Sequence, residues 1–313
     1  MLIYSTSHFV LPLPAAHRFP MRKYALLHER VAALAGELLR VPAAVSVDEL
    51  ALAHSHDYIG AVFEGTLSES SQKRIGFPWS APMVERSRHS AGATLAACRS
   101  ALAAGCGINL AGGTHHAHRD HGAGFCVFND AAVAIRTLQA EGAIDRALIV
   151  DLDVHQGDGS AAIFASDRSI FTFSMHGRGN FPFVKAASCL DVELADGTGD
   201  QEYLTALSIA MREILSPRPD LVVYLAGADP YIGDRLGRLA LSKRGLSTRD
   251  RSVLEMLRDC AIPVAIAMAG GYADVIEDIV DIHATTVEIA LALFEPSHDR
   301  CTSGTATRVS VTQ

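Results

Sequence analysis

Short apolar runs alternate with longer stretches of helical periodicity along most of this 313-residue chain. The runs are nearly continuous, which is typical of strands buried on both faces of a parallel sheet. We expect strands over residues 2–5, 107–111, 146–152, 169–174, 221–226 and 262–269. We expect helices over residues 23–39, 82–104, 130–141, 201–215, 248–260 and 274–294. The alternation predicts one α/β domain over residues 1–295, with helices on both faces of a parallel β-sheet, and a disordered tail over residues 296–313.

The composition favours a soluble protein and argues against several classes of partner. The chain carries 27 Lys and Arg against 35 Asp and Glu, so its formal charge of −8 does not suit a nucleic-acid-binding protein. No apolar run approaches the roughly 20 residues that cross a bilayer, and residues 1–20 do not resemble a secretory signal. Six cysteines without a CxxC motif are typical of reduced thiols. We therefore expect a cytoplasmic protein that binds no membrane; its oligomeric state is not readable from the sequence.

Polar residues follow the apolar strands at four separate points. They are the segment from Asp151 to His155, Ser174, Asp229 and the turn Gly270-Gly271-Tyr272. In an open parallel sheet, ligands bind outside the carboxyl ends of the strands. These four elements therefore deliver polar side chains to one edge of the predicted sheet.

Three of these residues suit a catalytic metal. Asp153 and His155 are two positions apart, so an extended backbone points both side chains to the same side, and Asp229 supplies a third ligand. Two carboxylates and one imidazole with an open coordination position are typical of a catalytic transition-metal site. The alternative interpretation is that they are caps and salt-bridge partners at strand ends.

Two adjacent histidines, His115 and His116, follow a Gly-Gly turn and have candidate partners in Asp151 and Asp158. A carboxylate bonded to one ring nitrogen fixes the tautomer and makes the other nitrogen more basic. Two such dyads could act as general base and general acid, taking a proton from one reacting group and giving it to another. Tyr272 could donate its hydroxyl to a developing oxyanion, the alternative being an ordinary buried tyrosine.

Several motifs together resemble the zinc-dependent histone deacetylase family, which has the arginase–deacetylase fold. They are LAGGTHHAHRDHGAGFCVFND (110–130), VDLDVHQGDGSAAIF (150–164), AGADPYIGDRLG (226–237) and AGGYA (269–273). RIGFPWS (74–80) and the GDRLG segment look closest to the class IV branch and its bacterial relatives. The resemblance covers residues 1–294.

The resemblance implies a role for each matched residue. The zinc (Zn²⁺) ligands would be Asp153, His155 and Asp229, with Fe²⁺ as an alternative ion in cells. The catalytic group would be His115, His116, Asp151, Asp158 and Tyr272. Substrate contacts would come from Gly124, Phe125, Phe181, Leu236 and Gly271. A structural monovalent cation, usually K⁺, would be held by Asp151, Asp153, His155, Ser174 and Met175.

The implied function is metal-dependent removal of acetyl or longer acyl groups from lysine side chains. A small N-acetylated amine or polyamine is the alternative substrate, although Leu236 stands where polyamine deacetylases carry a glutamate. Phe183-Val184 follows Phe181-Pro182 without the glycine usual in the family, so the rim of the tunnel is expected to differ.

Two alternatives of other kinds are a non-catalytic acyl-lysine-binding module and a dinuclear ureohydrolase. The ureohydrolase needs carboxylates where this chain has Gly157 and Tyr231.

Two further histidine clusters do not enter the predicted site. We interpret His54, His56 and Asp57 as structural or rim residues, because no carboxylate pair or Gly-rich turn accompanies them. His118, Asp120 and His121 are expected to be solvated loop residues.

Overall fold

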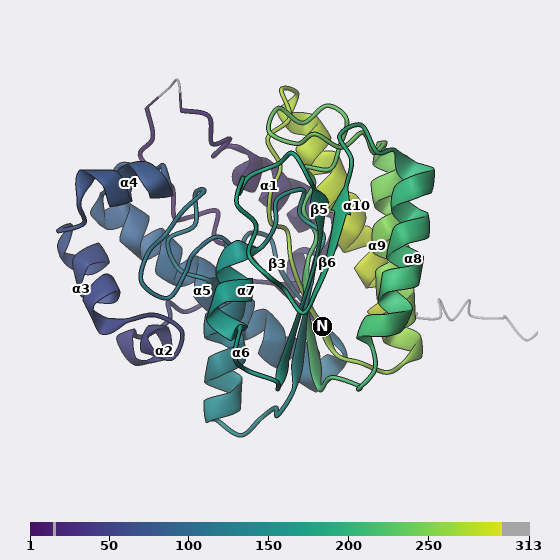
Figure 1. The fold of residues 1–313 in the computed structure, drawn as a ribbon, viewed down its shortest axis with the longest axis horizontal. Coiled ribbons are helices and arrows are strands. Elements are labelled where there is room, and N and C mark those ends of the chain that lie inside the picture. Colours follow the sequence, from purple (N-terminus) through teal and green to yellow (C-terminus); the bar gives the residue numbers. More distant parts are fainter. Residues whose placement is uncertain (15–16, 296–313) are drawn as a thin grey trace, which may run out of the picture.

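A computed structural model describes residues 1–14 and 17–295 of the chain (Figure 1). Its centre is an eight-stranded sheet in the order β2-β1-β3-β8-β7-β4-β5-β6, in which every pair is parallel. The strands are β1 (Leu2–Tyr4), β2 (Leu39–Arg40), β3 (Cys106–Asn109), β4 (Ala147–Asp151), β5 (Ile170–Gly177), β6 (Leu190–Leu194), β7 (Leu221–Leu225) and β8 (Val264–Ala267). The predicted parallel α/β fold is confirmed.

Helices cover both faces of this sheet. They are α1 (Lys23–Ala35), the 3₁₀ turn η1 (Gly36–Leu38), α2 (Val47–Ala51), α3 (His56–Glu64), α4 (Glu69–Ile75), α5 (Ala81–Ala104), α6 (Asp130–Ala140), α7 (Asp158–Phe164), α8 (Asp200–Ile214), α9 (Lys243–Asp259) and α10 (Ile276–Phe294). In Figure 1, α8, α9 and α10 lie on one side of the sheet and α5 and α6 on the other, with α2 to α4 outside α5.

Alternate side chains of the central strands enter two separate hydrophobic cores. Leu148 and Val150 of β4 belong to the core that includes α1, α8, α9 and α10. Ala147 and Ile149 of the same strand belong to the core that includes α5 and α6. Because both faces are buried, β4 is apolar from Ala147 to Val150, which is why the sequence shows a continuous run rather than an alternation.

The sequence-based boundaries differ from the structure in identifiable places. Strands β2 and β6 were not predicted, since one has two residues and the other, LDVEL, carries two acidic residues at the edge of the sheet. The short helices α2, α3, α4 and α7 were also not predicted, because five to nine residues give too little helical periodicity. Helix α9 begins at Lys243 rather than at residue 248, because the Ser242 hydroxyl accepts the Gly245 N–H and caps it.

Among the helices of the described residues, none combines the length and hydropathy that crossing a bilayer requires. The predicted tail, residues 296–313, lies outside the described part of the chain.

Candidate active site

The loops that carry the candidate residues follow four neighbouring strands of the sheet, β3, β8, β7 and β4. His115 and His116 follow β3, and Tyr272 follows β8. Asp229 follows β7, and Asp153 and His155 follow β4. Because all these strands are parallel, their carboxyl ends open onto one edge of the sheet.

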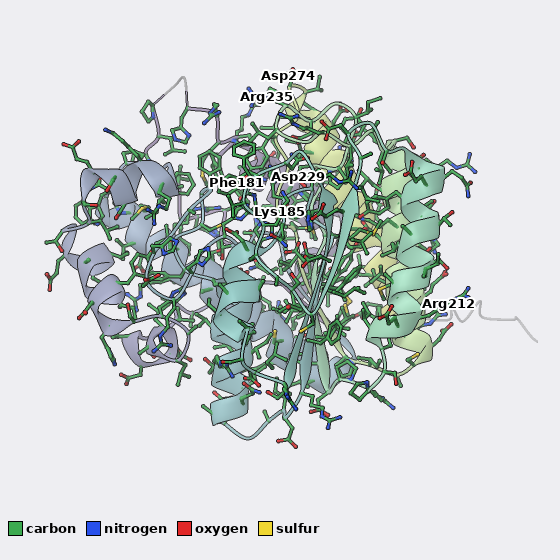
Figure 2. All side chains as sticks on the ribbon, viewed as in Figure 1. Phe181, Lys185, Arg212, Asp229, Arg235 and Asp274 are labelled. Atoms are coloured by element: carbon green, nitrogen blue, oxygen red, sulfur yellow. The ribbon has the colours of Figure 1, made fainter. Side chains whose placement is uncertain are left out.

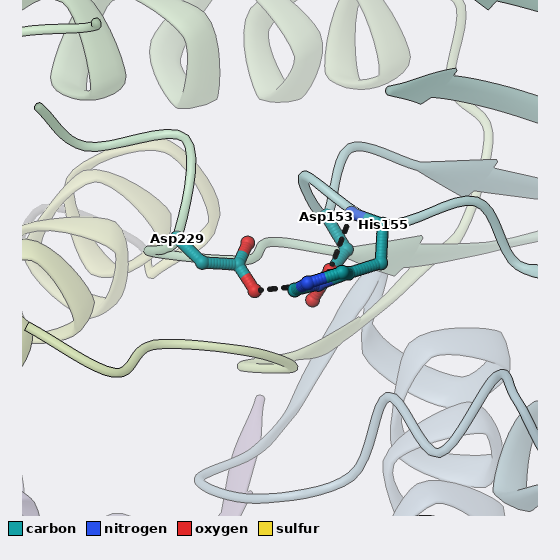
Figure 3. Close-up of side chains that lie close together, drawn as sticks. All are labelled: Asp153, His155 and Asp229. Atoms are coloured by element: carbon teal, nitrogen blue, oxygen red, sulfur yellow. Dashed lines mark hydrogen bonds and ion pairs between the residues drawn. The ribbon is translucent and has the colours of Figure 1, made fainter. Parts of the chain in front are cut away.

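The carboxylates of Asp153 and Asp229 flank the imidazole of His155 (Figure 3). Nδ1 of His155 lies 3.0 Å from Oδ1 of Asp153 and 3.4 Å from Oδ2 of Asp229. One ligand atom from each residue lies within 4.8 Å of the other two, and all three residues are buried. Backbone N–H groups hold the remaining oxygens, with Gly270 donating to Asp153 Oδ2 at 2.8 Å and Val154 donating to Asp229 Oδ1 at 2.9 Å.

This donor set fits a divalent cation. Oδ2 of Asp229 is buried and accepts no hydrogen bond, which is costly for a carboxylate unless a cation binds it. Burial and the neighbouring Asp153 carboxylate raise the pKa of Asp229 to about 7. A bound divalent ion would remove this repulsion, and nitrogen and carboxylate ligands suit zinc or ferrous iron.

The close packing of Gly270 against the carboxylates yields a test. A Cβ atom at position 270 would clash with Oδ2 of both Asp229 and Asp153, whereas a Cβ at Gly36 meets nothing within 4 Å. We expect Gly270→Ala to weaken divalent-metal affinity by about 10–100-fold, the usual range for changes behind metal ligands. Gly36→Ala is the matched control, and competition with a chelating dye is the measurement. Wild-type affinity in Gly270→Ala would contradict this arrangement.

The tandem histidines each bond one carboxylate through Nδ1. His115 lies 2.7 Å from Asp151 Oδ2, and His116 lies 2.6 Å from Asp158 Oδ1. Both imidazoles are buried, and their ring centroids are 4.1 Å apart.

The two imidazoles differ in basicity. Burial opposes protonation of His115, but the charges of Asp151 and Asp153 outweigh it and raise its pKa to about 9. Burial, together with the neighbouring charge of His115, lowers the pKa of His116 to about 4 in spite of Asp158. His116 is therefore the imidazole that is neutral near pH 7 and able to accept a proton.

Asp120 and His121 are exposed or half-exposed, as predicted. His118 also lies in a loop and is partly exposed, but it bonds a carboxylate of the site, which was not predicted. Its Nε2 lies 3.2 Å from Asp158 Oδ2, so Asp158 bonds the imidazoles of both His116 and His118. The ring of His118 also stacks on that of His121, with centroids 4.3 Å apart. Burial opposes ionisation of Asp158, but the hydrogen bonds to the two histidines hold its pKa well below the usual range. No local pattern could indicate this contact, because residues 118 and 158 are joined only by the tertiary fold.

His54 is structural, in agreement with its interpretation from the sequence. It is fully buried, its Nε2 accepts the Asn129 N–H at 2.9 Å, and its Nδ1 lies 2.9 Å from the His118 carbonyl oxygen. This imidazole therefore ties α6 to the loop that carries the tandem histidines. Because Nε2 accepts, Nδ1 carries the proton and the ring is neutral.

Burial lowers the pKa of His54 to about 4, against 6.5 for an ordinary histidine, and this predicts a pH dependence of stability. Between these values the unfolded chain binds the proton and the folded chain does not, so stability falls as pH falls from 6.5 to 4 and then levels off. The contribution is about 3 kcal/mol. Urea unfolding of wild type and His54→Gln at several pH values isolates it. An identical pH slope in both proteins would contradict the prediction.

Backbone contacts hold Tyr272 from both sides. Its N–H donates to Asp234 Oδ2 at 2.5 Å, and its carbonyl accepts from Arg235 Nε at 2.9 Å. Lys23 is buried and donates through Nζ to the Gly271 carbonyl at 3.2 Å. Burial raises the pKa of Tyr272 well above its usual value, so the hydroxyl keeps its proton. Asp234, Arg235 and Lys23 were not predicted as positioning residues; the GDRLG segment was the available signal for the first two.

Five residues of the site line a cavity of about 630 Å³: His115, His116, Asp153, His155 and Tyr272. Asp229 is not part of its wall. The cavity walls also include Gly124, Phe125, Phe181 and Leu236, four of the residues expected to contact a substrate, whereas Gly271 is not part of the wall. The Phe181 ring packs edge-on against His116, with centroids 4.8 Å apart. Phe125 lies 5.9 Å from the Tyr272 ring. Figure 2 shows Phe181 and Asp229 near the centre of the molecule and Arg235 and Asp274 near its upper edge.

Of the residues expected to hold a monovalent cation, Asp151 ends β4, and Asp153 and His155 follow it. Ser174 and Met175 lie within β5, so the expectation that Ser174 ends a strand is wrong, because β5 continues to Gly177. Ser174 pairs with Asp151 in the sheet register, and its hydroxyl lies 2.9 Å from His176 Nδ1. The K⁺ site stays a prediction.

The fold and site define a class of protein, the α/β proteins of arginase–deacetylase type. The crystal structure of the HDA15 HD domain is 24% identical, with a TM-score of 0.78 over 93% of this chain and 91% of that one. A structure described as an HDAC homolog complexed with SAHA gives the same identity and TM-score over 93% of this chain and 84% of the other.

The sequence comparisons give the family. The histone deacetylase domain matches residues 17–287. An uncharacterized protein of Picosynechococcus sp. is 46% identical over 88% of this chain and 93% of its own length. Histone deacetylase 8 of Xenopus tropicalis is 30% identical over 74% of this chain and 67% of its own length. Histone deacetylase 2 of Arabidopsis thaliana is 36% identical, and the match spans 49% of that protein. This chain belongs to the histone deacetylase family.

Proposed function

We propose that the protein is a metal-dependent amidohydrolase that removes acetyl or longer acyl groups from lysine side chains. One observation carries the proposal. Three buried metal-ligand candidates, Asp153, His155 and Asp229, lie in the same site as two His–Asp dyads and Tyr272. Family membership supports the deacetylase activity.

A divalent ion held by Asp153, His155 and Asp229 would polarise the amide carbonyl and make water a stronger nucleophile near neutral pH. His116 is neutral because burial lowers its pKa, and with Nδ1 bonded to Asp158 its Nε2 can take the proton released during attack. The same imidazole can return that proton to the departing lysine amine.

The other residues of the site hold charge and substrate. The protonated Tyr272 hydroxyl donates a hydrogen bond to the oxyanion that develops on the acyl carbonyl. His115, held by Asp151, contributes charge beside His116. Phe125 and Phe181 line the cavity and exclude water from the methylene stem of the lysine.

We propose Zn²⁺ as the ion, with Fe²⁺ able to use the same ligands, and K⁺ near Asp151 and Ser174. We also propose the class IV branch, on the RIGFPWS and GDRLG segments. A cytoplasmic location is supported by the free thiols of Cys98, Cys106, Cys126, Cys189 and Cys260; Cys301 lies outside the described residues.

A panel of lysine peptides that carry acyl groups of increasing length, together with acetylated small amines, tests the activity. We expect hydrolysis of acyl-lysine peptides that a chelator abolishes and added Zn²⁺ or Fe²⁺ restores. A metal-loaded protein that cleaves none of them would favour the binding-module alternative. Preferential cleavage of the small amines would assign the alternative substrate, and two tightly bound ions per chain would favour a ureohydrolase.

A further inference from the structure

The cavity lined by Asp153 and His155, two of the candidate metal ligands, has a cationic mouth. Five exposed basic side chains line it: Arg18, Lys73, Arg74, Arg235 and Arg238. Within the described residues, the one acidic residue in its wall is the buried Asp153. This local charge is opposite to that of the whole chain, whose formal charge is −8.

Three of these cations form ion pairs, but the pairs are exposed and leave the cations available to a ligand. Arg235 lies 3.2 Å from Asp274, and Arg238 lies 3.1 Å from Asp196, with both carboxylates at least half exposed. Lys73 lies 3.6 Å from Glu69, whose side chain is 92% exposed. Exposed ion pairs of this kind are weak, because water competes for both charges.

Arg18 and Arg74 have no ion-pair partner within 4.0 Å among the described residues. They lie in separate parts of the chain, Arg18 before α1 and Arg74 in α4. Arg235 and Arg238 lie in a third segment, after β7, and Figure 2 places Arg235 near the upper edge of the molecule. The cations therefore reach the mouth from three segments.

We propose that the substrate is an acyl-lysine within an acidic peptide segment, with Asp or Glu side chains flanking the modified lysine. This inference rests on the proposed deacylase function. The acyl group and lysine stem fill the cavity, and the flanking residues remain at the mouth, where the exposed cations can contact carboxylates. A small acylated amine carries no flanking carboxylates for these cations to contact. Charge complementarity of this kind raises the association rate and excludes basic sequences.

Three peptides of equal length test the proposal. Each carries the same acyl-lysine, with flanking residues that are acidic, neutral or basic. We expect kcat/KM for the acidic peptide to exceed that for the basic peptide by about tenfold or more at low ionic strength. The ratio should decline towards one near 0.5 M salt, because salt screens exposed charges, and kcat should differ little.

The double variant Arg18→Gln/Arg74→Gln tests whether the preference for acidic peptides arises from the cations at the mouth of the cavity. We expect it to reduce the acidic-to-neutral ratio of kcat/KM several-fold. Arg212→Gln is the matched control, because Arg212 is an exposed arginine of α8 at the far right of Figure 2. It should keep the wild-type ratio.

The outcomes separate this inference from the proposed function. Equal kcat/KM for the three peptides, or a preference for the basic one, overturns the acidic-substrate proposal and leaves the deacylase activity standing. The same conclusion follows if the double variant keeps the wild-type ratio. If the metal-loaded protein cleaves none of the peptides and no other acylated amine, the proposed function fails, and this inference fails with it.

Discussion

Asp229→Asn is expected to remove tight binding of a divalent ion and to reduce acyl-lysine hydrolysis by about 10³-fold or more. The reason is that Asp229 Oδ2, buried without a hydrogen-bond partner, is one of three candidate ligand atoms. A catalytic metal supplies several kcal/mol of charge stabilisation, and each 1.36 kcal/mol corresponds to a factor of ten. Metal content and kcat/KM measured on the same samples check this result.

Although Asp229→Asn should lower activity, it should not lower the folding stability of the metal-free protein at pH 8. In the metal-free wild type the pKa of Asp229 is raised to about 7, so the folded protein retains a proton that the unfolded chain releases near pH 4. Stability from this group is therefore full below pH 4 and is lost as pH rises to about 7. At pH 8 we expect metal-free Asp229→Asn to be at least as stable as metal-free wild type, and added metal should no longer raise its Tm.

Asp259→Asn is the matched control, because Asp259 is an exposed carboxylate at the end of α9. It should keep metal binding, activity and the metal-dependent rise in Tm. Stoichiometric metal in Asp229→Asn with wild-type affinity would show that the ion uses other ligands.

Tyr272→Phe is expected to lower kcat by about 10²–10³-fold, the usual cost of losing one oxyanion donor. Phenylalanine keeps the ring that packs near Phe125, so KM, metal content and Tm should change little. Steady-state kinetics on the best acyl-lysine peptide provide the measurement.

Tyr231→Phe is the matched control. The Tyr231 hydroxyl lies 3.3 Å from Asp278, outside the cavity wall, so its loss should leave kcat within about twofold of wild type. Full turnover in Tyr272→Phe would show that another group stabilises the oxyanion, and the role proposed for this tyrosine would be wrong.

Part of the fold was predictable because its signals are local. The buried strands β3, β4, β5, β7 and β8 are short apolar runs, and the long helices α5, α8 and α10 repeat an apolar face over several turns. Strand β2 and the short helices α2 and α4 contain too few residues for such a pattern. Their positions depend on contacts with segments distant in sequence. For example, Arg40 of β2 pairs with Tyr4 of the adjacent strand β1.

The candidate site shows the same division. Spacing alone indicated that Asp153 and His155 share a side, because alternation along an extended backbone is a local property. The contact between His118 and Asp158 joins residues forty positions apart, and no local pattern indicated it for that reason. The cationic mouth is also non-local, since it combines residues from three segments of an acidic chain.

The sequence by itself determined which residues can bind a metal or move a proton, and that they follow buried parallel strands. The tertiary structure alone decided that β3, β8, β7 and β4 are neighbours, in an order unrelated to their order in the chain. Chemical identity and periodicity reside in a few consecutive residues, whereas strand order depends on how helices many residues away pack on the two faces of the sheet. That packing brings Asp229 to within 3.4 Å of His155, although 74 positions separate them in sequence.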